Sequence, residues 1–200
     1  MKLRYFLLNK PYGYLSQFTD NTKAKNKTLG ELYDFPRDVY SVGRLDKDSE
    51  GLLIITNDKG LNHRLLNPRF QHEREYYALV QGAINDDHLK RLKEGVVISL
   101  GAGQMYKCRP AKARKLEKEP NIGERAKPIS SRGNHPLEWL SLTLHEGKNR
   151  QVRRMTAAVG LPTLRLFRAR IEGLDSSGLE IGETIEMEQE ELMNKLFKKA

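Results

Sequence analysis

The stretch from Gly43 to Asp58 constrains the fold of this 200-residue chain more than any other part of it. The apolar run at residues 52–55 is too short for a core helix and is typical of a buried strand. The polar residues before it, Gly43 to Gly51, must then form a loop that leads into this strand. Because binding and catalytic residues concentrate in loops on a rigid scaffold, we expect functional side chains here.

Other segments predict an α+β fold with a central mixed, mainly antiparallel sheet flanked by helices and loops. Short apolar runs predict strands at residues 5–8, 14–18, 39–42, 75–80, 96–100, 107–116, 137–144, 163–171 and 183–187. Capping residues and apolar spacing predict helical segments at residues 28–33, 58–66, 85–95, 149–159 and 189–199. Residues 117–136 are rich in Pro, Gly, Ser and charge, which favours a long loop.

The net charge of +9 favours an acidic partner such as nucleic acid or an anionic membrane. The charge is concentrated in residues 101–170, which hold 16 basic and 5 acidic side chains, and ten of the basic ones are arginine. Arginine pairs bidentately with phosphate, so we expect RNA or DNA rather than a merely solvated face.

In the absence of a recognisable targeting segment, the cytoplasm is the default compartment. No run approaches the roughly 18 apolar residues of a membrane-spanning helix, and the N-terminus lacks the apolar region of a signal peptide. The single cysteine, Cys108, excludes an internal disulfide and suggests a reducing compartment. We expect a monomer that does not bind membranes.

Three carboxylates, Asp46, Asp48 and Glu50, resemble the start of a calcium-binding loop. The pattern then fails, because Asn57 occupies the position that requires a bidentate glutamate, and the flanking segments are predicted strands. We therefore interpret Asp48 and Glu50 as solvated turn residues. We interpret Asp46 as a buried carboxylate, which needs a partner to balance its charge. The histidines show no metal-ligand spacing and no nucleotide-binding glycine motif occurs, so neither a metal nor a cofactor is predicted.

A second informative stretch is the glycine-led helix start that follows Glu146. It carries Lys148, Arg150, Arg153 and Arg154, which predict an anion site. Arg150 and Arg154 share a helix face, whereas Arg153 is turned about 100 degrees away and could meet a buried partner. The simpler interpretation is a phosphate-binding helix and nothing more.

The third informative stretch contains the neighbouring tyrosines Tyr76 and Tyr77. On a strand they face opposite sides, so one should lie in the core. The other could be a stacking platform for an unpaired base, although the residues alone favour a core position for both.

Together these stretches carry a resemblance to the RsuA/RluB/E/F branch of the pseudouridine synthases. The resemblance covers about residues 3–187 and rests on ordered motifs: Asn9-Lys10-Pro11-x-Gly13, Gly43-Arg44-Leu45-Asp46 through Asn57, Arg74-x-Tyr76, and Glu146-Gly147-Lys148 through Met155. The segment that follows Arg153 is most similar to the E-type member, which acts on 23S rRNA.

The resemblance implies cofactor-free isomerisation of an rRNA uridine to pseudouridine on a flipped-out base. Asp46, at the floor of a central cleft, would be the nucleophile, and Arg153 would keep it ionised and oriented. Tyr76 would stack on the target uracil, and Arg44 would fill the gap that the flipped base leaves. Lys10 would have a structural or phosphate-contacting role, while Lys148, Arg150 and Arg154 would bind RNA.

The resemblance also implies a catalytic domain over residues 1–187, which could comprise two subdomains, and a helical tail over residues 188–200. Many relatives carry an N-terminal S4-type RNA-binding domain. This sequence starts at the first catalytic strand, as the E-type member does, which would shift RNA capture onto the catalytic domain.

Two rival functions remain open from the sequence. A non-catalytic RNA-binding or ribosome-assembly protein could share the fold and the charge. A metal-dependent nuclease could use Asp46, Asp48 and Glu50, and it would lose activity with a chelator.

Overall fold

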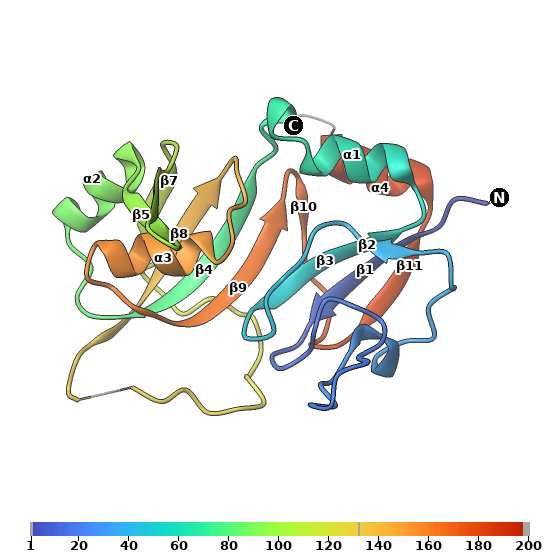
Figure 1. Ribbon diagram of the computed structural model, residues 1–200, viewed down its shortest axis with the longest axis horizontal. Helices are drawn as coiled ribbons and strands as arrows, with labels where there is room; N and C mark the ends of the chain where they lie inside the picture. Colours follow the sequence, from blue (N-terminus) through green and yellow to red (C-terminus); the bar gives the residue numbers. More distant parts are fainter. Residues whose placement is uncertain (1, 132, 198–200) are drawn as a thin grey trace.

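The apolar run at residues 52–55 lies in strand β3 (Glu50–Thr56), every residue of which is buried. The computed structural model describes residues 2–131 and 133–197. Within them, β3 belongs to a nine-stranded mixed sheet whose main path runs β11-β1-β3-β9-β4-β8-β7 (Figure 1). This confirms the predicted central mixed sheet.

The remaining strands of this path are β1 (Tyr5–Lys10), β4 (Arg74–Gln81), β7 (Lys112–Lys115), β8 (Leu137–Leu144), β9 (Thr163–Ile171) and β11 (Thr184–Met187). Two short strands extend it: β2 (Tyr40–Ser41) pairs with β3, and β10 (Leu174–Asp175) pairs with β9. A separate antiparallel hairpin joins β5 (Val97–Gly101) to β6 (Gln104–Lys107).

The two halves of the sheet meet where β3 runs parallel to β9, while the other neighbouring strands pair antiparallel. The parallel register covers only Glu50 opposite Phe167 and Gly51 opposite Arg168. Gly51 has φ +103°, and a Cβ built there would lie 2.4 Å from the carbonyl oxygen of Arg168. Glycine is therefore required for the strands to approach this closely.

Each half has its own helices (Figure 1). Helices α1 (Lys59–Leu66) and α4 (Gln189–Phe197) share an apolar cluster with β1 and β3. Helices α2 (Asp86–Glu94) and α3 (Gln151–Ala158) share another with β4 and β8. No helix in the described ranges is long and apolar enough to cross a membrane.

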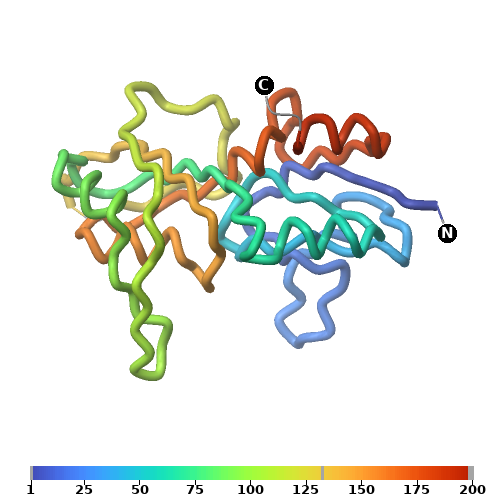
Figure 2. Tube along the Cα trace, turned by 90° about the horizontal axis from the view of Figure 1, so that it is seen from above, coloured from blue at the N-terminus to red at the C-terminus, as the bar shows by residue number. Residues whose placement is uncertain are grey.

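Two parts of the chain protrude from the same side of the molecule (Figure 2). One is the β5–β6 hairpin, and the other is a loop between β1 and the 3₁₀ turn at Leu29–Glu31.

Two predicted strands are wrong. Residues 14–18 form no strand, only an isolated bridge between Leu15 and Thr28. The predicted strand at residues 107–116 is split into the end of β6 and all of β7. Pro110 lies in the break and has no N–H to donate to a strand neighbour. The long loop predicted at residues 117–136 is confirmed for its described residues.

Candidate active site

A cavity of about 620 Å³ lies between the loop that enters β3 and the start of α3. Three segments line it with residues that the sequence singled out. The loop contributes Arg44 and Asp46, strand β4 contributes Tyr76, and the β8–α3 connection contributes Lys148 and Arg150. The fold therefore gathers five of the eight predicted site residues in one place.

Asp46 lies at the edge of this cavity with its side chain 36% exposed. Its Oδ2 is 3.5 Å from Nη1 of Arg150. The buried hydroxyl of Ser16 anchors the loop just before Asp46: it accepts from the Leu45 N–H (3.0 Å) and donates to the Leu45 carbonyl (2.7 Å). Asp46 is thus held on a fixed loop while its carboxylate remains accessible.

Arg150 joins this loop to α3. Its Nη1 and Nη2 each donate a hydrogen bond to one oxygen of the Asp48 carboxylate, both at 2.8 Å. The hydrogen bonds with Arg150 lower the pKa of Asp48 and raise the pKa of Arg150. Arg150 has φ +51°, so the predicted helix begins only at Gln151. Asp48 is therefore an anchored residue rather than a solvated turn carboxylate.

The structure corrects the predicted pairing of Arg153 with Asp46. Nη2 of Arg153 donates to the Asp48 carbonyl (2.7 Å) and lies 3.4 Å from Oδ2 of Asp48. Its Nη1 donates to the Thr163 carbonyl (3.1 Å). Among the ion pairs of the described residues, Arg150 and not Arg153 faces Asp46. The reason is the loop conformation, which places Asp48 between the two arginines.

Glu50 is also not the solvated residue that the sequence suggested. It is 2% exposed and forms a bidentate ion pair with the buried Arg165 of β9, at 2.9 and 3.0 Å. The three carboxylates of the loop therefore point to different places: Asp46 to the cavity, Asp48 to Arg150 and Glu50 to Arg165. Accordingly, no metal-binding group of three such ligands occurs in the described part of the chain.

The two neighbouring tyrosines separate as predicted. Tyr76 lines the cavity, and Tyr77 packs on the opposite face of β4 against a cluster that includes Trp139 and Phe167. The β4–β9 register shifts between Glu75 and Tyr76, so that Tyr76 lies opposite Arg168. The irregularity falls at the residue whose side chain enters the cavity.

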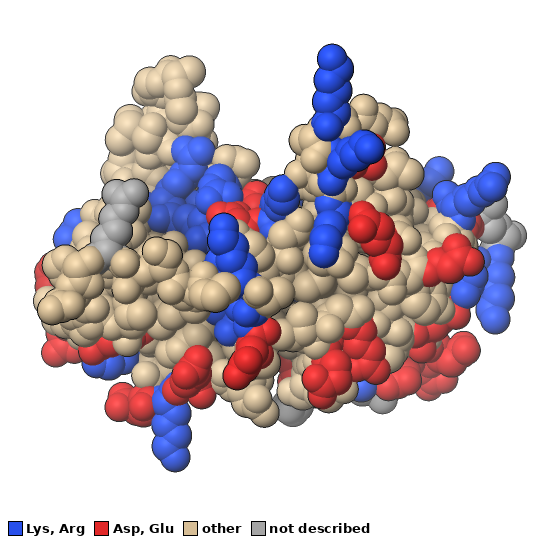
Figure 3. Space-filling view, turned by 90° about the horizontal axis from the view of Figure 1, so that it is seen from below, with Lys and Arg blue, Asp and Glu red and all other residues tan. Residues whose placement is uncertain are grey.

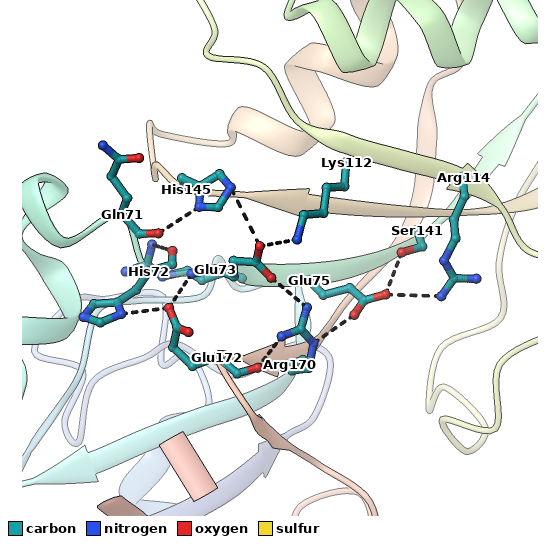
Figure 4. Close-up of polar contacts among 11 residues, drawn as sticks. Gln71, His72, Glu73, Glu75, Lys112, Arg114, Ser141, His145, Arg170 and Glu172 are labelled. Atoms are coloured by element: carbon teal, nitrogen blue, oxygen red, sulfur yellow. Dashed lines mark hydrogen bonds and ion pairs between the residues drawn. The ribbon is translucent and has the colours of Figure 1, made fainter. Parts of the chain in front are cut away.

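A polar network on the other face of the sheet holds β4 beside this shift (Figure 4). Glu75 accepts hydrogen bonds from Ser141 (2.7 Å) and Arg170 (3.1 Å), and Arg170 also pairs with Glu73 at 3.2 Å. The sequence analysis missed these contacts because the partners come from β4, β8 and β9, far apart in the chain.

The sequence left open whether Lys10 is structural or contacts an RNA phosphate. Its side chain is fully buried, and Nζ donates to the carbonyls of Pro11 (2.9 Å) and Ser49 (2.8 Å). Burial lowers the pKa of Lys10 to about 8. Of the two roles that the sequence left open, the structure favours the structural one, because Lys10 braces the loop at Ser49.

Of the other predicted cations, Arg44 and Lys148 line the cavity and Arg154 does not. Arg44 and Lys148 are exposed, and Nζ of Lys148 lies 4.7 Å from the centre of the Tyr106 ring. Arg154 donates to the Ser99 carbonyl and to Oδ1 of Asn149, which ties α3 to the β5–β6 hairpin. In Figure 3, Lys and Arg side chains gather in the hollow between the two protruding parts. The arrangement is an accessible carboxylate and an aromatic ring within a basic cavity.

Comparisons with known proteins agree on one family. The sequence model of a family described as RNA pseudouridylate synthase matches residues 4–158. A protein of Xanthomonas axonopodis pv. citri named ribosomal large subunit pseudouridine synthase E is 50% identical over 165 residues, covering 82% of this chain and 84% of its own. A protein of the same name from Xanthomonas campestris pv. campestris is 45% identical, covering 88% of this chain and 91% of its own.

A solved structure gives the same result for the fold. A crystal structure titled pseudouridylate synthase superposes with a TM-score of 0.77 at 26% sequence identity. The match covers 97% of this chain and 74% of that one. The α+β architecture predicted from the sequence is thereby confirmed.

Proposed function

This chain belongs to the RNA pseudouridylate synthase family, and from that premise we propose that it isomerises a uridine of large-subunit rRNA to pseudouridine. The family is the one that the ordered motifs predicted. The names of the two Xanthomonas relatives support large-subunit rRNA as the substrate, and the concentration of arginine in residues 101–170 suits an RNA partner.

One observation carries the proposed chemistry: the Asp46 carboxylate and the Tyr76 ring line the same cavity. Arg44, Lys148 and Arg150 add positive charge around them. A uridine flipped out of an RNA helix could insert its base against Tyr76 and bring its ribose to Asp46, while its phosphates remain among the cations.

Asp46 acts as the nucleophile on the flipped nucleotide, either at C1′ of the ribose or at the uracil ring. The N1–C1′ bond breaks, the uracil turns, and C5 bonds to C1′. The proton on C5 is released and N1 takes up a proton, so that the product is an isomer of the substrate. The carboxylate is regenerated at the end, and a covalent route of this kind divides one difficult step into two easier ones.

The residues around Asp46 position it. Arg150 faces the carboxylate directly, and Arg153 holds the backbone carbonyl of Asp48 two residues further on. We propose that Arg153 acts through the loop conformation rather than through an ion pair with Asp46. Tyr76 stacks on the target base, which is worth about 1–3 kcal/mol for an aromatic platform, and Arg44 fills the space that the base vacates.

We further propose that one chain acts alone in the cytoplasm. The proposed rRNA substrate supports this compartment, and a cavity that already holds both Asp46 and Tyr76 needs no second chain to supply either residue. Sedimentation of the protein with and without rRNA would test the oligomeric state.

The decisive experiment is tritium release from large-subunit rRNA that carries 5-tritiated uridine. The wild type should release tritium, and Asp46→Asn should release none while retaining its affinity for the RNA. Asp175→Asn, an exposed residue of β10, is the matched control and should behave as the wild type. Turnover by Asp46→Asn at the wild-type rate would contradict the proposed nucleophile. RNA binding without tritium release by the wild type would instead favour the non-catalytic RNA-binding protein.

A further inference from the structure

A second cavity, of about 380 Å³, adjoins the first on the far side of Arg150. Arg150 lines both cavities. The walls of the second one include Tyr12, Asp48, Arg125 and Arg153. Arg125 comes from the long loop at residues 117–136, which the sequence motifs did not involve in function.

The side chains that line this second cavity carry mainly positive charge. Three guanidinium groups line it, and Asp48 is the one carboxylate among its lining residues. Arg153 is largely buried, and its burial together with the neighbouring Arg150 and Arg125 lowers its pKa, although Asp48 and Asp46 act in the opposite direction. An anion in this cavity would therefore relieve repulsion between the arginines.

The arginines also retain unused hydrogen-bond donors. Arg125 donates Nη1 to the Leu164 carbonyl at 3.2 Å, and its buried Nε has no partner within the described chain. Nε of Arg153 is likewise buried without a partner there. An arginine presents five N–H groups, so each of these side chains has donor capacity left for a further acceptor.

Arg125 is held in position rather than loose on its loop. Its guanidinium lies 3.8 Å from the centre of the Tyr12 ring, and Tyr12 lies two residues after the end of β1. A cation stacked on an aromatic ring in this way keeps its N–H edge free while its face is covered.

From these observations we propose that the second cavity binds a phosphodiester of the RNA backbone beside the target uridine. This inference rests on the proposed function, because it takes the first cavity as the site of that uridine. A phosphodiester carries one negative charge and accepts paired guanidinium hydrogen bonds, which suits an arginine cluster with a single fixed carboxylate. The shared Arg150 makes the two cavities neighbours, as consecutive groups of one RNA strand require.

Asp48 has a defined part in this arrangement. Its bidentate pair with Arg150 and its contact with Arg153 fix both guanidinium groups before RNA arrives. Arg125 then supplies the additional positive charge that an RNA phosphate needs, since Asp48 offsets much of the charge of one other arginine.

The test compares Arg125→Gln with the wild type in binding to deproteinised large-subunit rRNA over a series of salt concentrations. Loss of one phosphate contact should reduce the slope of log K against log salt by about 0.7–0.9. In tritium release, KM should rise about tenfold while kcat changes less than about twofold, because a phosphate contact contributes uniform binding. Arg125→Lys, which keeps the charge, should restore the salt slope.

Arg114→Gln is the control, because it removes the same charge from an exposed arginine that contacts Glu75 on the face of β4 opposite to Tyr76. It should leave the salt slope and KM unchanged. An unchanged slope in a folded Arg125→Gln variant, or an equal loss in Arg114→Gln, would overturn the inference. If the wild type releases no tritium, the proposed function fails, but the salt slopes still report on the phosphate contact by themselves.

Discussion

Glu50 and Arg165 form a bidentate ion pair that is buried beneath the loop carrying Asp46. Both side chains are less than 5% exposed, and the pair connects β3 to β9 at the point where the two halves of the sheet meet. Arg165 also donates to the Gly123 carbonyl (3.0 Å), so the same guanidinium supports the long loop that contains Arg125.

We expect Glu50→Gln to lower the free energy of unfolding by about 3–5 kcal/mol, because it leaves a buried guanidinium without its counter-charge. Urea titration followed by circular dichroism would measure the loss. Glu186→Gln is the control, since Glu186 pairs with Arg4 at the surface and such a pair contributes at most about 1 kcal/mol. Equal effects of the two substitutions would contradict the prediction.

The second prediction about stability concerns Gly51. An alanine there would combine an unfavourable φ of +103° with a Cβ 2.4 Å from the backbone of β9. We expect Gly51→Ala to cost more than about 3 kcal/mol, since strain and clash act together. Gly13→Ala is matched, because Gly13 has φ +91° but open space around it, and its cost should stay near 1 kcal/mol. Thermal unfolding of both variants would separate clash from strain.

The lowered pKa of Lys10 predicts a specific pH dependence of the free energy of unfolding. Its pKa is lowered to about 8 in the folded protein from 10.5 in the unfolded chain. Between these values the unfolded chain binds a proton that the folded protein has released, so the free energy of unfolding should rise with pH by up to about 3 kcal/mol. Above pH 10 this gain is opposed, because burial raises the pKa of Tyr5.

Urea unfolding from pH 7.5 to 10 would measure this rise for the wild type and for Lys10→Met. The variant lacks the titrating group and should show a flatter profile. It should also be less stable at neutral pH, because the carbonyls of Pro11 and Ser49 lose their donor. Parallel pH profiles for the two proteins would contradict the lowered pKa of Lys10.

Tyr76 and Tyr77 offer a comparison of neighbours with different surroundings. Tyr76→Leu should lower kcat/KM for tritium release by about 10- to 100-fold, the value of one base stacked on an aromatic ring. Tyr77→Leu should leave kcat/KM within about threefold and lower the melting temperature instead, because Tyr77 packs on the opposite apolar cluster. A larger loss of activity in Tyr77→Leu would contradict the assignment of Tyr76 to the base.

The sequence by itself determined which segments are buried and which family the chain belongs to. The run at residues 52–55 is typical of a short buried strand, and Asp46 lies six residues before it in a polar loop. The alternation of strand side chains likewise placed Tyr76 and Tyr77 on opposite faces, although it did not show which of them faces the cavity. The excess of arginine predicted a basic surface because charge counts do not depend on the fold.

Only the tertiary structure decided which charged groups meet. Arg153 and Asp46 are both in the motifs, yet the loop conformation turns Asp48 toward Arg153 and leaves Asp46 to Arg150. Glu50 was predicted to be a solvated turn residue, but Arg165 of β9 pairs with it in the interior, and the burial of Lys10 favours the structural one of its two predicted roles. Whether two charged groups come within about 4 Å depends on how segments more than 100 residues apart fold together. A local sequence pattern carries no information about that distance.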